Sequence, residues 1–463
     1  SYADCPAESA VSHRGAARCV SPARLKRRKS KASLRHESGC APARRVYAPS
    51  TEVSVYRLRC EVQPYAWGSR TLIADLLGRP ASGGPEAELW LGAHPRCSSR
   101  LLAATDRGEE HALTDWIERD PTRALGATVT TRFGARLPFL FKVLAADQPL
   151  SLQAHPTLQQ AREGYAAENR AGVPLDAPTR NYKDDNHKPE LVVALSRFVA
   201  LAGFREPKQA LALLSHFGFS SPDSPLFDAW RHLHGSPDPS GLRRFFETSF
   251  RTEREALRLS ISQMVEIAAR PSASDDAEVK SLSGWLLRLA HLHPSDPGVV
   301  AAILLRLIVP EPGEALFLPE GNLHAYLAGL AIEVMASSDN VLRGGLTEKH
   351  VDLSELLRVM NFESPPPAVQ SGAHTRAAGG AERVRYPTSA AEFELSLISF
   401  AAGDALHERG PAILLCLEGA FEIESDATRV EMRRGDSFFC AADAPFTLRG
   451  AGRVALAGVN PSA

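Results

Sequence analysis

Four side chains are of the kinds that bind a transition metal, and the sequence allows them to act together: Gln153, His155, Glu190 and His324. Gln153 and His155 are two residues apart in a segment predicted as a strand, so both side chains point to one face. Glu190 stands just before the apolar run 191–195, which predicts a buried strand. Two imidazoles, a carboxylate and an amide oxygen suit a zinc ion that keeps room for water or substrate, although each residue alone is equally typical of an ordinary strand end.

The segment NYKDDNHKPE (181–190) concentrates charged and hydrogen-bonding side chains directly before that strand. A solvated loop is the ordinary explanation for such a stretch. On an extended backbone His187 and Lys188 face opposite ways. Glu333 is a further polar residue of interest, because it interrupts the apolar run 330–336, where a carboxylate is costly unless it is paired or functional. We therefore predict an active-site role for Glu333.

The elements that must position these residues follow from hydrophobic periodicity. Residues 137–146 and 149–155 are predicted strands joined by a tight turn at 147–148. Between 206 and 308 the apolar residues recur at helical spacing, and Pro and Asp clusters punctuate the helices. Further strands are predicted at 314–319, 330–336, 393–400, 412–424 and 436–441. Short strands with Gly/Pro turns around a helical block predict a mainly β protein with an inserted α domain.

A weak internal repeat indicates that the β part is duplicated. GEALFLPEGNLH begins at Gly313 and GDSFFCAADAPF begins at Gly435, and both run glycine, acid, strand, turn. Position twelve is His324 in the first copy and Phe446 in the second. One copy is thus predicted to be an active site and the other a scaffold without metal.

Composition excludes several classes of protein. The 463 residues contain no apolar run of the about 18 residues that span a membrane. Seven Cys without CxxC spacing indicate free thiols in a reducing compartment, so we expect a cytoplasmic protein. Residues 1–50 carry eleven Lys or Arg and three acidic residues, and the rest carries 42 basic and 51 acidic residues. The basic tail fits a nucleic-acid arm, a transit peptide or an inert remnant, whereas the acidic body gives no sign of nucleic-acid binding.

Longer segments resemble one family. NYKDDNHKPEL, SLQAHP and residues 324–349 closely resemble signature segments of the type I phosphomannose isomerases, and QPYAWGS (63–69) and AELWLGAHP (87–95) are similar to its N-terminal segments in the same order. The resemblance runs from about residue 55 to 355, is weaker in the helical block and fades towards the C-terminus. It implies a cupin jelly roll that carries the metal, an inserted helical domain and a second cupin-like domain.

Carried over by position, the resemblance places the ligands of one Zn²⁺ per chain on Gln153, His155, Glu190 and His324. It implies that Arg343 lies beside the substrate and that Lys188 is the active-site lysine. Lys188 and Glu333 are the candidates for the proton carrier, and Lys188 could act only after losing its charge. Pocket residues implied in the same way are Trp67, Glu88, Lys142, Ser151 and Asp339, with Lys142 and Ser151 as phosphate contacts; Trp90 is better explained as core packing.

The reaction implied is reversible isomerisation of mannose 6-phosphate and fructose 6-phosphate through a cis-enediol at the zinc site, in mannose and GDP-mannose metabolism. The predicted organisation is a disordered tail (1–52), a catalytic cupin domain (53–205 and 309–363), a helical domain (206–308), a linker (364–390) and a metal-free cupin-like domain (391–463). We expect a monomer whose partner is a phosphosugar, with no nucleic acid and no membrane. Another metal-dependent cupin enzyme, such as an iron oxygenase, and a non-catalytic sugar-binding cupin stay open as alternatives.

Overall fold

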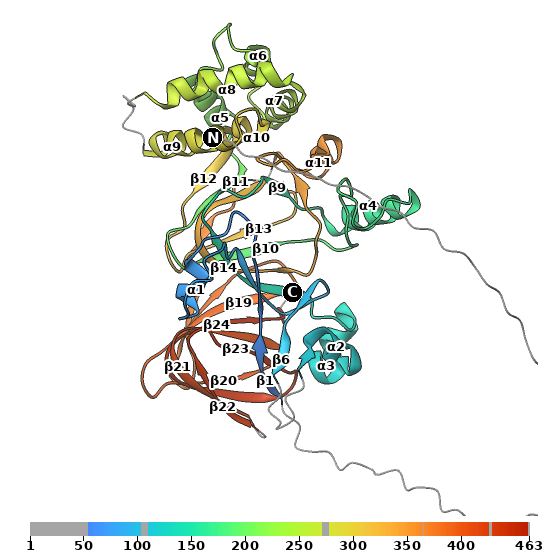
Figure 1. Cartoon of the computed structure of the whole chain (residues 1–463), viewed down its shortest axis with the longest axis vertical. Helices are drawn as coiled ribbons and strands as arrows, with labels where there is room; N and C mark the ends of the chain where they lie inside the picture. The colour runs from blue at the N-terminus through green and yellow to red at the C-terminus, as the bar shows by residue number, and fades with distance from the viewer. Residues whose placement is uncertain (1–53, 103–109, 271–276, 364, 426–427, 462–463) are drawn as a thin grey trace, which may run out of the picture. The chain divides into compact units, whose positions relative to one another are not determined.

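The computed structural model describes residues 54–461 except 103–109, 271–276, 364 and 426–427. In this part of the chain, eleven helices accompany two large antiparallel sheets, here called sheet I and sheet II (Figure 1). The basic tail predicted at 1–52 lies outside the described residues. Among the described helices, none is long and apolar enough to cross a membrane.

Sheet I carries the candidate metal ligands. Its strands are β16 (Val369–Gln370), β13 (Ala315–Leu318), β10 (Glu190–Ala194), β14 (His324–Ala336), β8 (Phe139–Ala146), β3 (Glu88–Leu91) and β2 (Glu61–Gln63), in this order, together with β9 (Gln153–Ala154), β11 (Val199–Phe204), β12 (Leu305–Ile308) and β15 (Leu342–Arg343). The long strand β14 changes partners along its length: residues 329–336 pair with β8, and 324–328 pair with β11. This switch brings the start of β14 next to β9, with His324 opposite Gln153.

Sheet II contains the second copy of the repeat. Its strands run in the order β17 (Ala373–Arg376), β18 (Glu382–Tyr386), β19 (Glu394–Phe400), β24 (Pro445–Gly458), β21 (Ala412–Ser425), β23 (Ser437–Cys440), β1 (Val55–Arg59), β6 (Arg100–Leu102) and β7 (His111–Ala112), with β20 (Ala405–Arg409) and β22 (Thr428–Arg433) added to β24 and β21. The N-terminal strand β1 pairs with β23 through Val55 and Cys440. Sheet II therefore uses strands from both ends of the described chain. Besides these sheets, β4 (Ala93–His94) and β5 (Cys97–Ser98) form a small hairpin.

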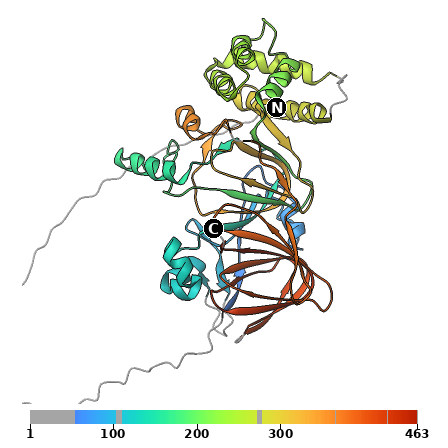
Figure 2. The ribbon, with the colours of Figure 1, turned by 180° about the vertical axis from the view of Figure 1, so that it is seen from behind.

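The helices confirm the periodicity of the block 206–308. Their bounds are α1 (Leu72–Leu76), α2 (Leu113–Arg119), α3 (Pro121–Phe133), α4 (Leu158–Arg170), α5 (Pro207–His216), α6 (Phe227–Gly235), α7 (Pro239–Arg251), α8 (Arg254–Ala268), α9 (Ala277–Leu292), α10 (Pro297–Leu304) and α11 (Leu353–Val359). Helices α5 to α10 gather as one group beside β11 and β12, as both views show (Figures 1 and 2). Their buried stripes, such as Leu282, Leu286 and Leu289 of α9, form a core that continues into the start of β14 through Leu323 and Ala325.

Two predicted features are wrong in detail. Residues 137–146 and 149–155 do not form a hairpin, because β8 pairs with β3 and β14, whereas only Gln153 and Ala154 of the second segment are strand and pair with β14 and β15. The predicted linker 364–390 contains strands β16, β17 and β18. The side chains of β17 at the edge of sheet II are exposed, which explains why a strand here has a polar composition.

Successive side chains along the strands of sheet I point to two different environments. In β10, Leu191 and Val193 point into a core shared with sheet II, where they meet residues such as Ile413 and Phe439. Glu190 and Val192 point to the opposite face of sheet I, as the two-residue period requires. All five residues of β10 are buried, so Glu190 must have partners on its face.

Candidate metal centre and active site

Three buried side chains converge on one point of sheet I. His155 follows β9, Glu190 begins β10 and His324 begins β14. One ligand atom from each lies within 4.8 Å of the others, and all three residues are buried. Among the described residues, this is the one group of three or more His, Cys, Asp or Glu close enough to hold a metal ion.

Backbone carbonyls fix the orientation of both imidazoles. Nδ1 of His155 lies 2.8 Å from the carbonyl oxygen of Asn340, and Nδ1 of His324 lies 3.0 Å from that of Asn322. A carbonyl oxygen only accepts hydrogen bonds, so each Nδ1 carries a proton, and in the neutral ring Nε2 then presents a lone pair. A histidine that ligates a metal is typically held in this way.

The two Nε2 atoms and the Glu190 carboxylate fit a cation. Both Nε2 atoms are buried and make no hydrogen bond, although the Glu190 oxygens lie 3.3 Å from Nε2 of His155 and 3.2 Å from Nε2 of His324. Burial, with the Lys188 charge adding to it, lowers the pKa of His155 to about 4, so this imidazole is neutral at physiological pH. With neutral rings, two lone pairs and an anion face one another and repel, and a bound cation would remove that repulsion.

Lys188 contacts the same carboxylate. Its Nζ lies 2.8 Å from Oε1 of Glu190, and both side chains are buried. Burial by itself would raise the pKa of Glu190, but the Lys188 ammonium and the two neighbouring imidazoles together outweigh burial, and the pKa is held well below its usual range. Glu190 is therefore an anion, as a ligand must be. The predicted opposite orientation of the neighbouring His187 is confirmed, because its ring bonds to Glu320 at 2.5 Å and to Glu392 at 2.8 Å.

Gln153 lies beside these residues by strand register. It is paired with His324 of β14 on one side and with Arg343 of β15 on the other. Residues directly opposite each other in an antiparallel pair share a face. The three side chains Gln153, His324 and Arg343 therefore form a row, and the amide lies next to the imidazole that it was predicted to join.

A buried polar chain runs from Glu190 across sheet I. The Tyr326 hydroxyl lies 3.3 Å from Glu190 and 3.1 Å from Glu333, and Lys142 pairs with Glu333 at 3.1 Å. Lys142 also lies 3.8 Å from Glu88, which accepts a hydrogen bond of 2.6 Å from the Trp90 indole. Burial raises the pKa of Glu333, and the charge of Lys142 opposes that effect. Pairing with Lys142 thus explains how this carboxylate is tolerated inside the strand.

Arg343 lies in a different environment, without an anion. Nη1 of Arg343 donates to the Ser151 hydroxyl at 3.2 Å, and no carboxylate of the described residues pairs with it. The charge of Arg343 lowers the pKa of Lys349, an exposed residue six positions further on in the same loop. Burial lowers the pKa of Arg343 as well. Within the described residues neither Arg343 nor Lys349 makes an ion pair, so the two cations offer a place for an anionic ligand.

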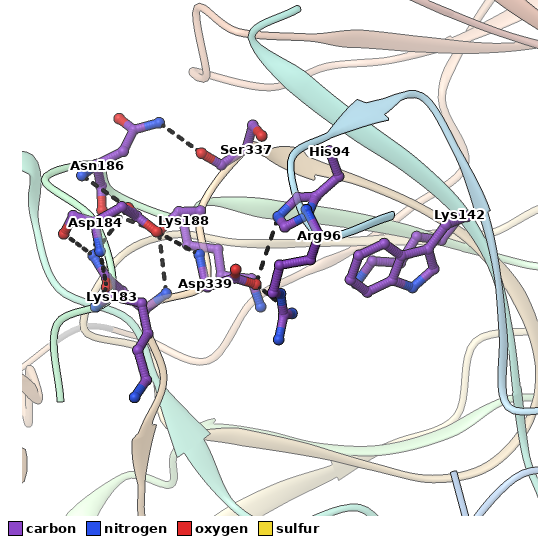
Figure 3. A network of polar contacts seen from close by, with 12 residues as sticks. His94, Arg96, Lys142, Lys183, Asp184, Asn186, Lys188, Ser337 and Asp339 are labelled. Atoms are coloured by element: carbon purple, nitrogen blue, oxygen red, sulfur yellow. Dashed lines mark hydrogen bonds and ion pairs between the residues drawn. The ribbon is translucent and has the colours of Figure 1, made fainter. Parts of the chain in front are cut away.

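Asp339 belongs to a network at the edge of the site (Figure 3). Its carboxylate accepts a bond of 2.6 Å from Arg96 and lies 3.6 Å from Nε2 of His94. Its backbone N–H donates to Asp184 at 2.7 Å. The buried Asn340 amide holds the same polar segment, because it accepts from the backbone of Lys183 at 2.7 Å and donates to the carbonyl of Asp184 at 2.8 Å. The decapeptide is therefore an ordered part of the site and not a solvated loop.

The remaining predicted pocket residues divide into two groups. Lys142 and Glu88 lie in the buried polar chain, whereas Ser151 lies with Arg343, so no direct contact joins the two predicted phosphate contacts. Trp67 stacks on Tyr65 with ring centroids 5.8 Å apart and packs against the apolar cluster that contains Tyr326. Trp90 is buried, as a core residue should be, and Arg96 and Lys142 each lie 5.6 Å from its ring centre.

Sequence reasoning did not single out Tyr326 and Lys349. A signal existed for Tyr326, because it lies two residues after His324, a spacing that puts both side chains on one face wherever the segment is a strand. Lys349 gave no such signal, since only the fold of the loop after Arg343 returns it to that side chain.

The fold and the site together define a class of protein. It is built on antiparallel sheets and has a buried group of side chains that can hold a metal. Beside this group lie the cations Arg343 and Lys349, for which the described residues provide no ion-pair partner. The sequence model described as phosphomannose isomerase type I, catalytic domain, matches residues 55–207. Mannose-6-phosphate isomerase of Salmonella typhimurium is 39% identical over 397 residues, covering 85% of this chain and 97% of the relative. Mannose-6-phosphate isomerase 1 of Arabidopsis thaliana is 31% identical over 423 residues, covering 87% and 94%. The chain therefore belongs to the type I phosphomannose isomerase family.

Solved structures agree with this assignment. A crystal structure of mannose 6-phosphate isomerase from Salmonella typhimurium, bound to the substrate fructose 6-phosphate and zinc, has a TM-score of 0.76 and 36% identity, covering 88% of this chain and all of that one. A zinc-bound mannose 6-phosphate isomerase has a TM-score of 0.77 at the same identity and coverage of this chain.

Proposed function

We propose that this chain is a zinc-dependent isomerase that interconverts mannose 6-phosphate and fructose 6-phosphate. The observation that carries the proposal is the pair of buried Nε2 lone pairs, of His155 and His324, aimed at an ionised Glu190. Membership of the family and the zinc and fructose 6-phosphate in a related structure support it.

Zinc fits the donor set. Two imidazoles, one carboxylate and the Gln153 amide oxygen are the hard and intermediate donors that zinc accepts, and the four would leave room for substrate or water. When bound, the ion would supply Lewis acidity to the oxygens of the sugar. Asn340 and Asn322 hold the two imidazoles in the ligating tautomer through their carbonyl oxygens.

The two cations beside this group give the substrate an orientation. Arg343 lies next to Gln153 in the sheet, so its guanidinium can stabilise negative charge that develops at the reacting end of an open-chain sugar. Lys349 and the Ser151 hydroxyl lie on the side of Arg343, and the three side chains together would bind the phosphate. Because Lys142 is already paired with Glu333 and Glu88, we assign it to the support of the buried carboxylates rather than to the phosphate.

Lys188 is the better candidate for the proton carrier. Moving hydrogen between C1 and C2 needs a group that removes a proton from one carbon and returns it to the other. Lys188 contacts Glu190 directly, whereas Glu333 is held by Lys142 and Tyr326. Glu333 then balances the charge of Lys142 within the buried polar chain. Asp339, Trp67 and Glu88 remain candidates for contacts with the sugar.

The finer organisation is also a proposal. We interpret sheet I and sheet II as two cupin jelly rolls and the helices of 206–308 as a domain inserted into the first. Only the first would carry metal. That the protein is a cytoplasmic monomer without nucleic-acid or membrane partners remains a prediction.

A coupled assay tests the function. The purified chain, supplied with Zn²⁺, should convert mannose 6-phosphate to fructose 6-phosphate and also catalyse the reverse reaction. Binding of the sugar phosphate without turnover would instead support a sugar-binding cupin. Activity that requires Fe²⁺ and oxygen would support a different cupin enzyme. Either result would contradict the proposal.

A further inference from the structure

A carboxylate of the helical block holds the loop that carries the two cations. Asp296 is the N-cap residue of α10, and its Oδ1 accepts from the backbone of Gly298 at 2.7 Å, as a helix cap does. The same carboxylate also accepts from the backbone of Leu346 at 2.8 Å and of Thr347 at 3.1 Å. Capping the helix needs only the first of these three bonds.

The loop that Asp296 holds has a backbone that does not form easily by itself. Leu346 has a φ of 56°, a left-handed conformation that is unfavourable for a residue with a side chain. Its side chain is buried in the core of the helical block, so packing and the Asp296 bonds together hold this conformation. A Cβ on Gly345 would lie 2.7 Å from Oδ1 of Asp296, so this position of the loop has no room for a side chain beside the carboxylate.

This loop connects Arg343 to Lys349. On one side, Gly344 donates to the Leu152 carbonyl at 2.7 Å, and β15 pairs with β9, which fixes Arg343 opposite Gln153. On the other side, the Thr347 hydroxyl accepts from the backbone of Lys349 at 3.1 Å. The bonds from Asp296 to 346 and 347 lie between these two anchors, and so they set how the two cations are placed relative to each other.

We infer that Asp296 is a positioning residue of the active site, through which the helical block holds Arg343 and Lys349 in the arrangement that binds a phosphate group. The inference rests on the proposed function, because it assumes that these cations receive the substrate phosphate. It assigns the helical block a part in substrate recognition although its own side chains need not touch the substrate.

The chain offers a matched control. Asp238 is the N-cap residue of α7 in the same block, is likewise followed by a proline, and accepts from the backbone of Gly241 at 2.9 Å. Its hydrogen bonds stay within its own helix start, with Gly241 and the Ser240 hydroxyl. Asp238→Ala therefore removes a helix cap without touching the loop.

The test compares Asp296→Ala with Asp238→Ala in the zinc-loaded full chain. The readouts are the inhibition constant of inorganic phosphate, kcat/KM, zinc content and Tm. We expect both variants to keep zinc, and Asp296→Ala alone to weaken phosphate inhibition and lower kcat/KM, each on the order of 10- to 100-fold, as misplacement of binding groups does. Asp238→Ala should leave both values as in the wild type.

A second variant keeps the test decisive if Asp296→Ala does not fold. Asp296→Asn retains one acceptor oxygen, enough for the Gly298 and Leu346 bonds, and loses the bond to Thr347, so we expect an intermediate effect on phosphate inhibition. Phosphate inhibition and kcat/KM equal to those of Asp238→Ala in whichever Asp296 variant folds would overturn the inference. A wild-type enzyme without turnover and without phosphate inhibition would instead contradict the proposed function itself.

Discussion

The two copies of the internal repeat share a backbone plan and differ in what fills it. Gly313 and Gly435 both have left-handed φ values, of 90° and 87°, and each leads into a short strand, β13 or β23. A turn then leads to a long strand, β14 or β24, at whose start His324 and Phe446 are equally buried, each 1% exposed. The scaffold thus tolerates either side chain, and the residue at this position decides whether the copy has a ligand.

The surroundings of the two residues differ accordingly. Phe446 lies in an apolar cluster with residues such as Leu414, Leu448 and Val454. His324 faces Glu190, with Tyr326 and Lys188 also bonded to that carboxylate. Buried charges are costly unless they are paired. Sheet II therefore supplies an apolar core, whereas sheet I carries a charged network that a metal would complete.

Exchanging the residues between the copies should have the largest effect in sheet I. His324→Phe removes a ligand that no neighbour replaces, so we expect zinc content near zero and loss of isomerase turnover. Metal analysis and the coupled assay measure both. His291→Phe, at an exposed position of α9, is the control and should keep metal and activity. Normal turnover in metal-free His324→Phe would break the assignment of sheet I as the metal-bearing copy.

The next largest effect is expected at Arg343, because a copy that serves only as a scaffold needs no residue of this kind. If it stabilises developing charge, Arg343→Ala should lower kcat on the order of 100- to 1,000-fold while zinc content stays normal. Arg343→Lys should restore little, because a point charge does not reproduce the planar guanidinium. An increase in KM with kcat unchanged would show that Arg343 only grips the phosphate. Unchanged kcat and KM in Arg343→Ala would remove it from the site.

The reverse exchange, Phe446→His, should affect stability and not metal content. It buries an imidazole in an apolar cluster without partners, at a cost of about 1–3 kcal/mol. Chemical denaturation measures the cost. We expect the zinc content to stay at that of the wild type, since the described residues place no other group of His, Cys, Asp or Glu there. A second equivalent of tightly bound zinc would show that sheet II retains a latent site.

The smallest effect concerns the bridge between the two regions. His187, before β10, bonds to Glu320 in the turn before His324 and to Glu392 just before β19. Burial opposes its charge, but the two carboxylates outweigh burial and raise its pKa to about 9 from the ordinary 6.5. Because the folded-state pKa is the higher one, the stabilisation is complete below about pH 6.5 and is lost as the pH rises through about 9.

We therefore expect His187→Gln to lower Tm by a few degrees near pH 6 and to match the wild type well above pH 9. Glu408→Gln is the control, because it breaks the Glu408–Arg383 pair, which contains no histidine. Its Tm deficit should be independent of pH across this range. A pH-independent deficit in His187→Gln would mean that the ring acts by packing and not by charge.

The sequence predicted those features that local chemistry determines. Helical stripes such as Leu257, Ile261 and Met264 and the buried strand β10 follow from periodicity and were confirmed. The hairpin after β8 was wrong because pairing with the distant β14 prevails over local turn preference. The convergence of His155, Glu190 and His324 depends on long-range register: their residue types only suggested it, and the resemblance to a family predicted it. The links from Asp296 to Leu346 and Thr347 span 50 and 51 residues and leave no local pattern.

The most direct test of the account is a titration of metal-free protein with Zn²⁺, in which isomerase turnover is recorded at each addition. With one metal-bearing copy and one scaffold copy, turnover should be absent at the start, rise linearly with added zinc and level off at about one equivalent per chain. Full turnover before any zinc is added, or a rise that continues to two equivalents, would contradict it.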